Sequence, residues 1–264
     1  MELIENLKDI ESRYSKWQGD DSLKGYPFVE NRYAPFTPAR RALPMLNLAL
    51  ITSAGAYVDG TSAFQSDSWD GDTSYREIPV EIEAEDLKFA GHGYDTAAVM
   101  EDLNAQIPID RLIEYENNAV IGRLNHVWWS TCGWIKNASA VASDLAPNLA
   151  ARLSRYEVQA ALLIPASRLC HQTLGIVARE IEEKAGIPTM LISVDRSVTD
   201  LVRAPRTAYY SGEFGSVAGK AGWPEYQRRV LDESLRWIET FDQPGSRKLA
   251  VEIETATEMA RGER

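Results

Sequence analysis

Residues 161–172 read ALLIPASRLCHQ, an apolar run that passes directly into a polar segment. The first six residues have the length and composition of a strand that is buried on both faces of a sheet. A helix pattern follows over 171–186, where apolar residues recur with helical spacing and Gly186 marks the end. Another buried strand is expected at 189–194, so this part of the chain predicts a strand–helix–strand unit.

The same alternation extends on both sides of this unit. Further strands are expected at 46–52, 76–82, 126–132 and 206–211, and further helices at 2–17, 147–158 and 223–241, with one or two more within 96–118. Strands that alternate with helices favour a parallel sheet with helices on both faces. The predicted fold class is therefore α/β with a mainly parallel sheet, and two pseudo-similar Rossmann-like halves are one arrangement that this pattern allows.

The order of these elements predicts three regions. Residues 1–44 form an N-terminal helix and an irregular arm rich in glycine, proline, aspartate and arginine. Residues 45–241 form the α/β region that carries catalysis or binding, and residues 242–264 form a helical tail. The loop at 56–80 is long for a compact domain, and loops of that length are usually functional.

The composition excludes several classes of function. The 264 residues carry a net charge of −11 and no run of basic residues, whereas nucleic-acid binding needs clustered lysine and arginine. No apolar run is long enough to cross a membrane. The start of the chain is an acidic amphipathic helix pattern and not a signal peptide, so a cytoplasmic protein is expected. The expected partners are a small-molecule substrate and either a partner subunit or further copies of the chain in a homo-oligomer.

Cys170 is the residue of this sequence that is best placed for catalysis. Ligands of open α/β sheets bind beyond the carboxyl ends of the strands, and residues 165–172 lie at such an end and also open a helix. Free backbone N–H groups and the helix dipole favour negative charge there, so the thiolate should form more easily. Arg168 and His171 are close in sequence and would stabilise it further. We expect Cys170 to act as a nucleophile or base; the alternative is a buried structural thiol.

Cys132 is the other cysteine, and it also ends a predicted strand. Two thiols at the ends of two strands of one sheet would form a redox pair or a two-base proton-transfer pair if they faced each other. Simple packing explains Cys132 equally well. Two cysteines in a cytosolic chain do not form a disulfide scaffold.

Polar loop residues are candidate ligands of a substrate. Arg76 ends a segment of glycine, aspartate and hydroxyl-bearing residues and offers a guanidinium to a carboxylate. His92 and Asp95 lie in a glycine-containing loop and Asp102 follows shortly after, a set that suits a cation or a polar substrate. Their spacing matches no strong metal signature, so neither a metal nor a cofactor is expected.

Ser53 is a further candidate, because it follows directly after the apolar run at 46–52. All of these loops follow strands or lie near strand ends, where folds of this class place their ligands. We therefore expect one cleft that contains Arg76, His92, Asp95 and Cys170.

At several places the sequence resembles the selenoprotein B family, which comprises the B component of glycine, sarcosine and betaine reductases and the related D-proline reductase subunit. The similar stretches lie between about residues 33 and 241, and their number and order are fairly specific although each motif alone is weak. They are YAPFTP (33–38), the strand and loop at 46–60, GDTSYREIP (71–79), HGYD (92–95), DLN (102–104), PIDRL (108–112), IG (121–122), CHQ (170–172), GIPT (186–189) and PR (205–206) with the glycine loop after it.

The resemblance implies reductase chemistry at the start of the helix after the strand at 161–166. In that family this strand ends in selenocysteine, two further residues and cysteine; the selenium acts on the substrate while a partner subunit carries a pyruvoyl group. Cys170 matches the cysteine, but Ser167 stands at the selenocysteine position. A serine hydroxyl is neither redox-active nor ionised at neutral pH, so the chain departs from the family pattern at its key atom. No pyruvoyl-forming segment is evident.

Two hypotheses of different class follow. The first is a thiol-dependent enzyme of this family that cleaves a C–N or C–S bond reductively in a small carboxylated nitrogen- or sulfur-containing metabolite. Its expected catalytic residues are Cys170, Ser167, His171 and Cys132, and racemase- or desulfurase-like chemistry at the cysteine is an alternative within it. The second is a non-catalytic binding subunit of a larger reductase complex.

The rate of thiol alkylation separates these hypotheses. If Cys170 is a low-pKa thiolate, it should react with iodoacetamide well below pH 8, because the thiolate is the reactive species. The labelled fraction of Cys170 is followed with time by peptide mass spectrometry. An inert thiol below pH 8 would favour the structural alternative.

Overall fold

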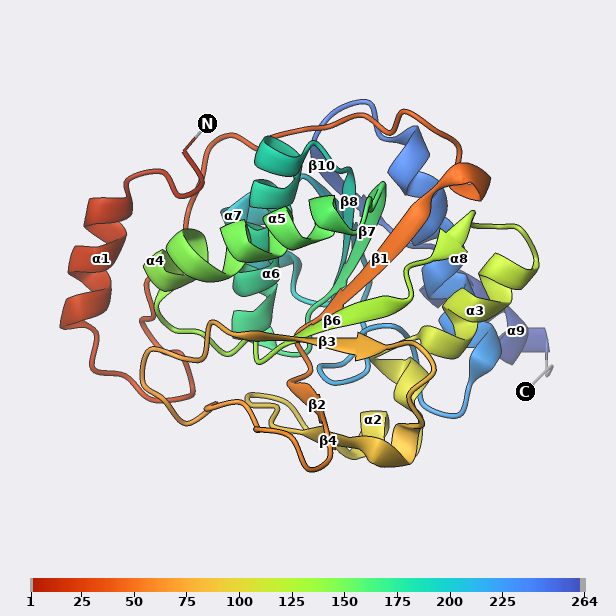
Figure 1. The fold of residues 1–264 in the computed structure, drawn as a ribbon, viewed down its shortest axis with the longest axis horizontal. Coiled ribbons are helices and arrows are strands. Elements are labelled where there is room, and N and C mark those ends of the chain that lie inside the picture. Colours follow the sequence, from red (N-terminus) through yellow and green to blue (C-terminus); the bar gives the residue numbers. More distant parts are fainter. Residues whose placement is uncertain (1, 262–264) are drawn as a thin grey trace.

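A twisted sheet lies at the centre of the molecule, and helices cover both of its faces (Figure 1). The computed structural model describes residues 2–261. The strands are β1 (Asn47–Thr52), β2 (Ala56–Val58), β3 (Tyr75–Pro79), β4 (Leu87–Phe89), β5 (Arg123–Leu124), β6 (Val127–Thr131), β7 (Ala160–Ile164), β8 (Thr189–Ser193), β9 (Arg206–Tyr209) and β10 (Gly245–Lys248).

The main sheet has eight strands in the order β10-β9-β8-β7-β1-β6-β3, with β5 also paired to β1. All of its pairs are parallel except the pair of β3 with β6, which puts an antiparallel strand at one edge. The predicted α/β class with a mainly parallel sheet is therefore confirmed. The strand order does not divide the sheet into two similar halves, so that part of the prediction stays without support.

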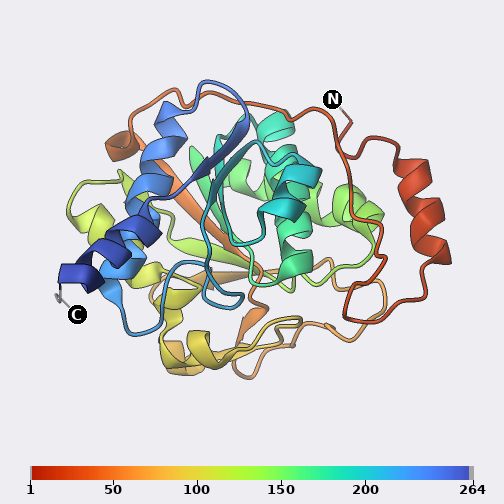
Figure 2. The ribbon, with the colours of Figure 1, turned by 180° about the vertical axis from the view of Figure 1, so that it is seen from behind.

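Helices lie on both faces of the sheet (Figures 1 and 2). They are α1 (Leu7–Lys16), α2 (Ala97–Glu101), α3 (Ile109–Asn117), α4 (Ala138–Ala140), α5 (Ala146–Arg155), α6 (Arg168–Glu180), α7 (Arg196–Val202), α8 (Pro224–Thr240) and α9 (Val251–Arg261). Along β1, Leu48 and Leu50 point into a core shared with α3 and α8, whereas Ala49 and Ile51 point into a core shared with α5, α6 and α7. This alternation is the two-residue period of a strand, and it explains why β1 is apolar throughout.

The strand order changes direction at β1. The chain that leaves the carboxyl end of β1 continues through α3 on one face of the sheet, whereas the chain that leaves the neighbouring strand β7 enters α6 on the other face. The segments after adjacent strands therefore separate, and this is where open α/β sheets bind ligands. Ser53 follows β1 and Ser167 follows β7, so both lie at this point.

Two of the differences between the structure and the predicted elements concern strands. Residues 245–248 form β10 and extend the main sheet, although a helical tail was predicted from residue 242; only α9 is helical there. A second, two-stranded sheet of β2 and β4 lies below the main sheet (Figure 1); β2 falls within the predicted loop at 56–80, and β4 lies after the strand predicted at 76–82. No helix among residues 2–261 is long and apolar enough to span a membrane.

Buried polar residues of α6 and its continuation fix the N-terminal arm. Gln172 accepts from the backbone N–H of Val29 at 2.8 Å and donates to the hydroxyl of Tyr26 at 2.9 Å. Arg179 donates to backbone carbonyls at both ends of the arm, those of Leu3 and Tyr33. The arm is therefore attached to the fold by hydrogen bonds that are shielded from water, and such bonds are costly to break.

A buried ion pair continues this attachment. Glu182 and Arg206 are in contact at 2.5 Å, and neither side chain is exposed to solvent. Glu182 also accepts from the backbone N–H of Thr37 in the arm and of Thr189 at the start of β8. Arg206 lies over the ring of Phe36 at 4.1 Å and donates to the carbonyl of Thr37. The pair therefore joins the arm to two strands of the sheet.

We predict that Glu182→Gln lowers the free energy of unfolding by about 3 kcal/mol, because it leaves the Arg206 guanidinium as an uncompensated buried charge. Urea unfolding followed by circular dichroism measures the change. Glu85→Gln, at an exposed position, is the matched control and should change stability by less than about 0.5 kcal/mol. A loss below about 1 kcal/mol in Glu182→Gln would contradict the importance given to this pair.

Candidate functional site

Cys170 is the third residue of α6 and thus lies at the start of this helix, as the sequence predicted; Ser167 is the N-cap residue. The Ser167 hydroxyl accepts no capping hydrogen bond from the helix; instead it donates to the sulfur of Cys170 at 3.0 Å. The thiol in turn donates to the carbonyl of Ser53, at 3.7 Å. Ser53, Ser167 and Cys170 are all fully buried. The structure thus brings together three predicted site residues from the ends of β1 and β7.

Two glycine-containing loops close over this thiol. A Cβ atom at Gly133 would come within 2.7 Å of the Cys170 sulfur and 2.3 Å of the Ser53 Cβ, so the Gly133 backbone lies directly against the thiol. Tyr94 donates its hydroxyl to the carbonyl of Ala54 at 2.6 Å, one residue beyond the carbonyl that Cys170 contacts. Gly133 and Tyr94 therefore cover the site from segments that are distant in sequence.

The loop after β9 holds Tyr94 from the other side. Gly215 donates its N–H to the carbonyl of Ala166, next to Ser167, and a Cβ at Gly215 would meet the Tyr94 ring at 2.6 Å. Only a residue without a side chain allows this close approach, and the positive φ of Gly215, 81°, also favours glycine. The glycine loop that the sequence analysis associated with the family is thus part of the cover of the site.

The state of the thiol differs from the sequence expectation. Burial raises the pKa of Cys170, and the hydrogen bonds from the serine residues and the helix start only oppose this effect. A helix N-terminus was expected to favour the thiolate, but the complete removal of water has the larger effect. We now expect slow alkylation of Cys170 at neutral pH while the cover is closed.

Cys132 directly follows the last residue of β6 and is 1% exposed. Burial raises its pKa to about 12, and the charge of the nearby Cys170 adds to that increase. The two thiols therefore lie in one buried region, but both favour the protonated form at neutral pH.

His171 is fully buried and both of its ring nitrogens have partners. Nδ1 lies 2.6 Å from the carbonyl of Ser167, and Nε2 lies 3.1 Å from the backbone N–H of Val194. Because a carbonyl only accepts and an N–H only donates, Nδ1 carries the proton and Nε2 accepts. Burial lowers the pKa of His171 to about 4, so the ring is neutral at neutral pH. With no free nitrogen, this ring holds the start of α6 in place and cannot take a proton from Ser167 or Cys170 in this arrangement.

Arg76, Asp95 and Asp102 make their contacts outside the Ser53–Ser167–Cys170 cluster. Arg76 lies within the edge strand β3 and donates to the hydroxyl of Ser74 and to the carbonyl of Ser62. Asp95 accepts from the N–H of Ala97 at the start of α2. Asp102 caps the turn that follows α2, and its carboxylate also accepts from the N–H of Gly222 and from the side-chain amide of Gln227 in α8. Their roles as substrate ligands stay predictions.

His92 is connected to the Ser53–Ser167–Cys170 cluster by its contact with Trp134. Its ring stacks on the indole of Trp134 with a centroid distance of 4.7 Å, and Trp134 directly follows Gly133 in the chain. Its Nε2 bonds to the carboxylate of Asp21 at 2.8 Å, and the same carboxylate bonds to Lys136. The structure therefore connects His92, but not Arg76, to the surroundings of Cys170.

Four residues that form this environment were missed by the sequence analysis: Tyr94, Gly133, Trp134 and Lys136. Tyr94 stands inside the HGYD motif, which was quoted for the family, so it could have been considered. The other three follow Cys132 directly in the stretch GWIK, 133–136, and nothing in that stretch indicates which way its side chains point.

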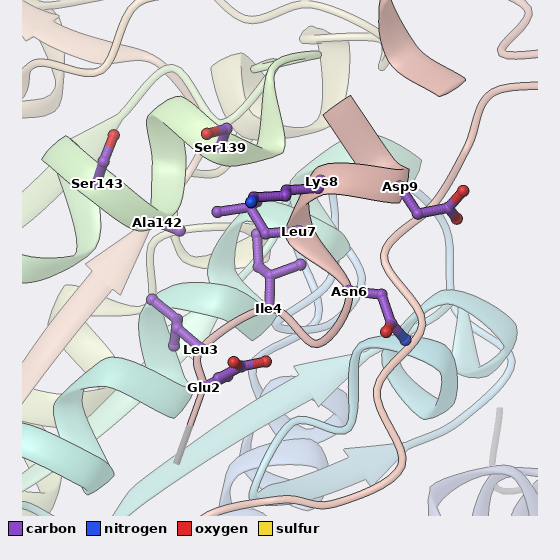
Figure 3. Close-up of a pocket in the computed structure, with 10 residues that line it drawn as sticks. All are labelled: Glu2, Leu3, Ile4, Asn6, Leu7, Lys8, Asp9, Ser139, Ala142 and Ser143. Carbon is purple, nitrogen blue, oxygen red and sulfur yellow. The ribbon is translucent and has the colours of Figure 1, made fainter. Parts of the chain in front are cut away.

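One surface groove lies away from the closed thiol. A groove of about 770 Å³ separates the N-terminal segment and the first turns of α1 from α4 (Figure 3). None of the predicted site residues lines this groove, whose lining consists of Glu2, Leu3, Ile4, Asn6, Leu7, Lys8, Asp9, Ser139, Ala142 and Ser143. Within residues 2–261, no group of three or more histidine, cysteine or carboxylate side chains is arranged to hold a metal ion.

Comparison with known proteins gives one family. The model of the glycine/sarcosine/betaine reductase selenoprotein B family matches residues 10–166, which ends one residue before Ser167. The D-proline reductase subunit gamma of Acetoanaerobium sticklandii is 29% identical over 210 residues, 80% of this chain and 85% of that protein. No solved structure is significantly similar to the chain.

Two further relatives belong to other reductase complexes. The glycine reductase complex component B subunit gamma of Symbiobacterium thermophilum is 28% identical over 195 residues, 70% of this chain and 43% of that protein. The sarcosine reductase complex component B subunit beta of Peptoclostridium acidaminophilum is 26% identical over 183 residues, 69% and 41% of the two chains. The chain thus matches less than half of the length of these two relatives, but most of the D-proline reductase subunit.

We predict that the buried neutral ring of His171 makes the protein less stable as the pH falls. Between about pH 6.5, the ordinary histidine pKa, and about pH 4, the unfolded chain binds a proton that the folded chain does not, so the free energy of unfolding decreases towards acid. This group alone should contribute a loss of about 3 kcal/mol over that window.

Urea unfolding at pH 7 and pH 4 in wild type and His171→Asn tests this prediction. The variant should be less stable at pH 7 but should lose less stability on acidification, whereas His126→Gln, at an exposed position, should behave like wild type. Equal losses on acidification in wild type and His171→Asn would contradict it.

Proposed function

Since the chain belongs to the glycine/sarcosine/betaine reductase selenoprotein B family, we propose that it is a thiol-dependent subunit of a reductase complex, with Cys170 as its working thiol. The observation that carries this proposal is the contact of 3.0 Å between Ser167 and Cys170 at the point where the segments after β1 and β7 separate. Ligands of open α/β sheets bind at this point, and a sulfur is the strongest nucleophile that this cluster offers.

The proposed substrate is a small carboxylated metabolite that contains nitrogen or sulfur. The names of the relatives mention D-proline, glycine, sarcosine and betaine, each of which carries a carboxylate and a nitrogen on the adjacent carbon. The closed site around Cys170 suits a small molecule, because the loops with Gly133 and Tyr94 leave no open space beside the sulfur.

The proposed reaction is a reductive cleavage that consumes two thiols. The sulfur of Cys170 forms a C–S bond as the C–N bond breaks, and the amine leaves with a proton. An external thiol then attacks the Cys170 sulfur; the substrate carbon takes the electron pair of the C–S bond and a proton, and a mixed disulfide forms. A second external thiol releases Cys170 as a thiol, so the carbon is reduced and two external thiols are oxidised to a disulfide.

Ser167 supports the sulfur in this scheme and does not replace it. Its hydroxyl donates to the Cys170 sulfur, and a donor of this kind stabilises the thiolate form. Because Cys170 is fully buried, the scheme also requires the cover to open before the substrate enters. Tyr94 and Gly133 are the residues that must move, and closure over a bound substrate would exclude water.

A second candidate is a binding subunit without chemistry of its own. The complete burial of Cys170 and the raised pKa of its thiol favour this candidate, because both reduce the reactivity of the sulfur. It predicts saturable binding of a small metabolite without turnover, whereas the first predicts a dependence of turnover on Cys170.

We predict that Cys170→Ala abolishes turnover, whereas Ser167→Ala reduces it three- to tenfold. Loss of the nucleophile should cost several orders of magnitude, and loss of one hydrogen bond costs about 0.5–1.5 kcal/mol. The assay offers D-proline, glycine, sarcosine and betaine in turn, with dithiothreitol as the thiol and with the co-purified complex, and measures substrate loss by mass spectrometry. Cys132→Ala is the matched control thiol.

Three other outcomes decide against this assignment. Near-normal turnover in Cys170→Ala would exclude thiol chemistry at this position. A dead Ser167→Ala with an active Cys170→Ala would assign the reaction to the serine. Saturable binding of one of the four compounds without any turnover in wild type would favour the binding subunit. Circular dichroism checks that each variant is folded.

A further inference from the structure

The carboxylate of Asp21 holds two side chains that come from the surroundings of Cys170. One of its oxygens accepts from Lys136 Nζ at 2.8 Å, and the other lies 2.8 Å from His92 Nε2. A carboxylate that is ionised can only accept, and its contacts with Lys136 and His92 lower the pKa of Asp21. Lys136 and His92 are therefore two donors arranged to receive the two oxygens of one carboxylate.

The two sides of this contact differ in burial. Only 9% of the Lys136 side chain is exposed and 27% of the His92 side chain, but 55% of Asp21 is exposed. The ammonium belongs to the folded body, since Lys136 also lies over the ring of Trp69 at 4.8 Å and its backbone carbonyl accepts from Tyr26. A buried ammonium needs a negative partner, because leaving it unpaired is costly.

Asp21 comes from the N-terminal arm and not from the α/β region. It lies in a turn between α1 and the arm segment that Gln172 holds, and the carboxylate of the neighbouring Asp20 accepts from the N–H of Ser22 within the same turn. The body of the protein thus presents the two donors, and an exposed turn of the arm supplies the acceptor.

The segment that carries Lys136 leads directly to the thiol. It begins with Gly133, whose backbone lies against the Cys170 sulfur, and continues with Trp134, on which His92 stacks. Trp134 is 2% exposed, and its indole N–H has no hydrogen-bond partner among the described residues. An unpartnered buried donor is uncommon in folded proteins, and this one belongs to the residue that directly follows Gly133 and stacks on His92.

From this arrangement we propose that Lys136 and His92 form the site for the carboxylate of the substrate, and that the carboxylate of Asp21 occupies this site in the resting protein. The assignment rests on the proposed function for the identity of the substrate class and adds the residues that bind its carboxylate. A substrate carboxylate would replace Asp21 on the same two donors, and the turn at 20–25 would move away from Lys136 and His92.

An intramolecular carboxylate competes strongly with a free one. A group that its own chain holds beside a site acts at an effective concentration on the order of millimolar or more, so it suppresses the binding of a free carboxylate. Removal of Asp21 should therefore uncover the site, and a simple carboxylate should bind more tightly than it does to wild type.

The test uses acetate as the probe and the ring protons of His92 as the reporter. The chain contains only three histidines, so the NMR signals of His92 are identified by their loss in His92→Gln. We expect acetate to shift these signals saturably in Asp21→Ala, with a dissociation constant at least tenfold lower than in wild type. Asp20→Ala is the matched control, because it removes one carboxylate from the same turn but leaves Asp21 in place, and it should bind acetate like wild type.

Two further variants test the role of Lys136. In the Asp21→Ala background, Lys136→Met should abolish the saturable shift and Lys136→Arg should retain it. All titrations are made at constant ionic strength with chloride as the balancing anion. An equal effect of acetamide would show that the site does not require a charged carboxylate.

The proposal is wrong if acetate gives no saturable shift in Asp21→Ala, or if Lys136→Met leaves the shift unchanged. Asp21 is then only an anchor of the arm. Neither result depends on Cys170, so a failure here leaves the turnover test of Cys170→Ala unaffected, and an inactive enzyme does not affect the binding titration.

Discussion

The guanidinium of Arg179 is the point on which the arrangement of the N-terminal arm depends. It lies in the last turn of α6, is 1% exposed, and donates to the backbone carbonyls of Glu2, Leu3, Tyr33 and Arg203. A guanidinium has five N–H donors in a fixed plane, so it can hold several chain segments in one geometry. The same helix carries Cys170 in its first turn. The position of the arm and the position of the thiol are therefore fixed by opposite ends of one helix.

This coupling connects stability with the site. With Gln172 and Glu182, Arg179 forms a buried polar face of α6 and its continuation that binds the arm over most of its length. The arm segment between α1 and Val29 carries Asp21. The bond of Gln172 to Val29 holds this segment close to the body of the protein, where Asp21 contacts Lys136 and His92. A long irregular segment of this kind would be mobile without such contacts, because it has little regular secondary structure to order it.

Much of the α/β core could be predicted from the sequence, because its signals are local. The apolar run at 161–166 became β7, the periodic segment after it became α6, and Cys170 lies at the start of that helix. Strand β10 was missed because Gly245–Lys248 contains no apolar residue and pairs as an edge strand. The closure over Cys170 was missed for a different reason. Tyr94 and Gly133 come from separate loops, and the burial that raises the thiol pKa arises only when the fold brings them together.

The closed cover over the two thiols also bears on oxidative damage. Peroxides oxidise a cysteine when it is ionised and accessible, and the products beyond the sulfenic acid are not restored by ordinary thiols. Cys132 and Cys170 meet neither condition in the resting protein, since both are buried and burial raises the pKa of each. Such a protein should keep its sulfur reduced in the presence of oxygen and expose it only while the cover is open.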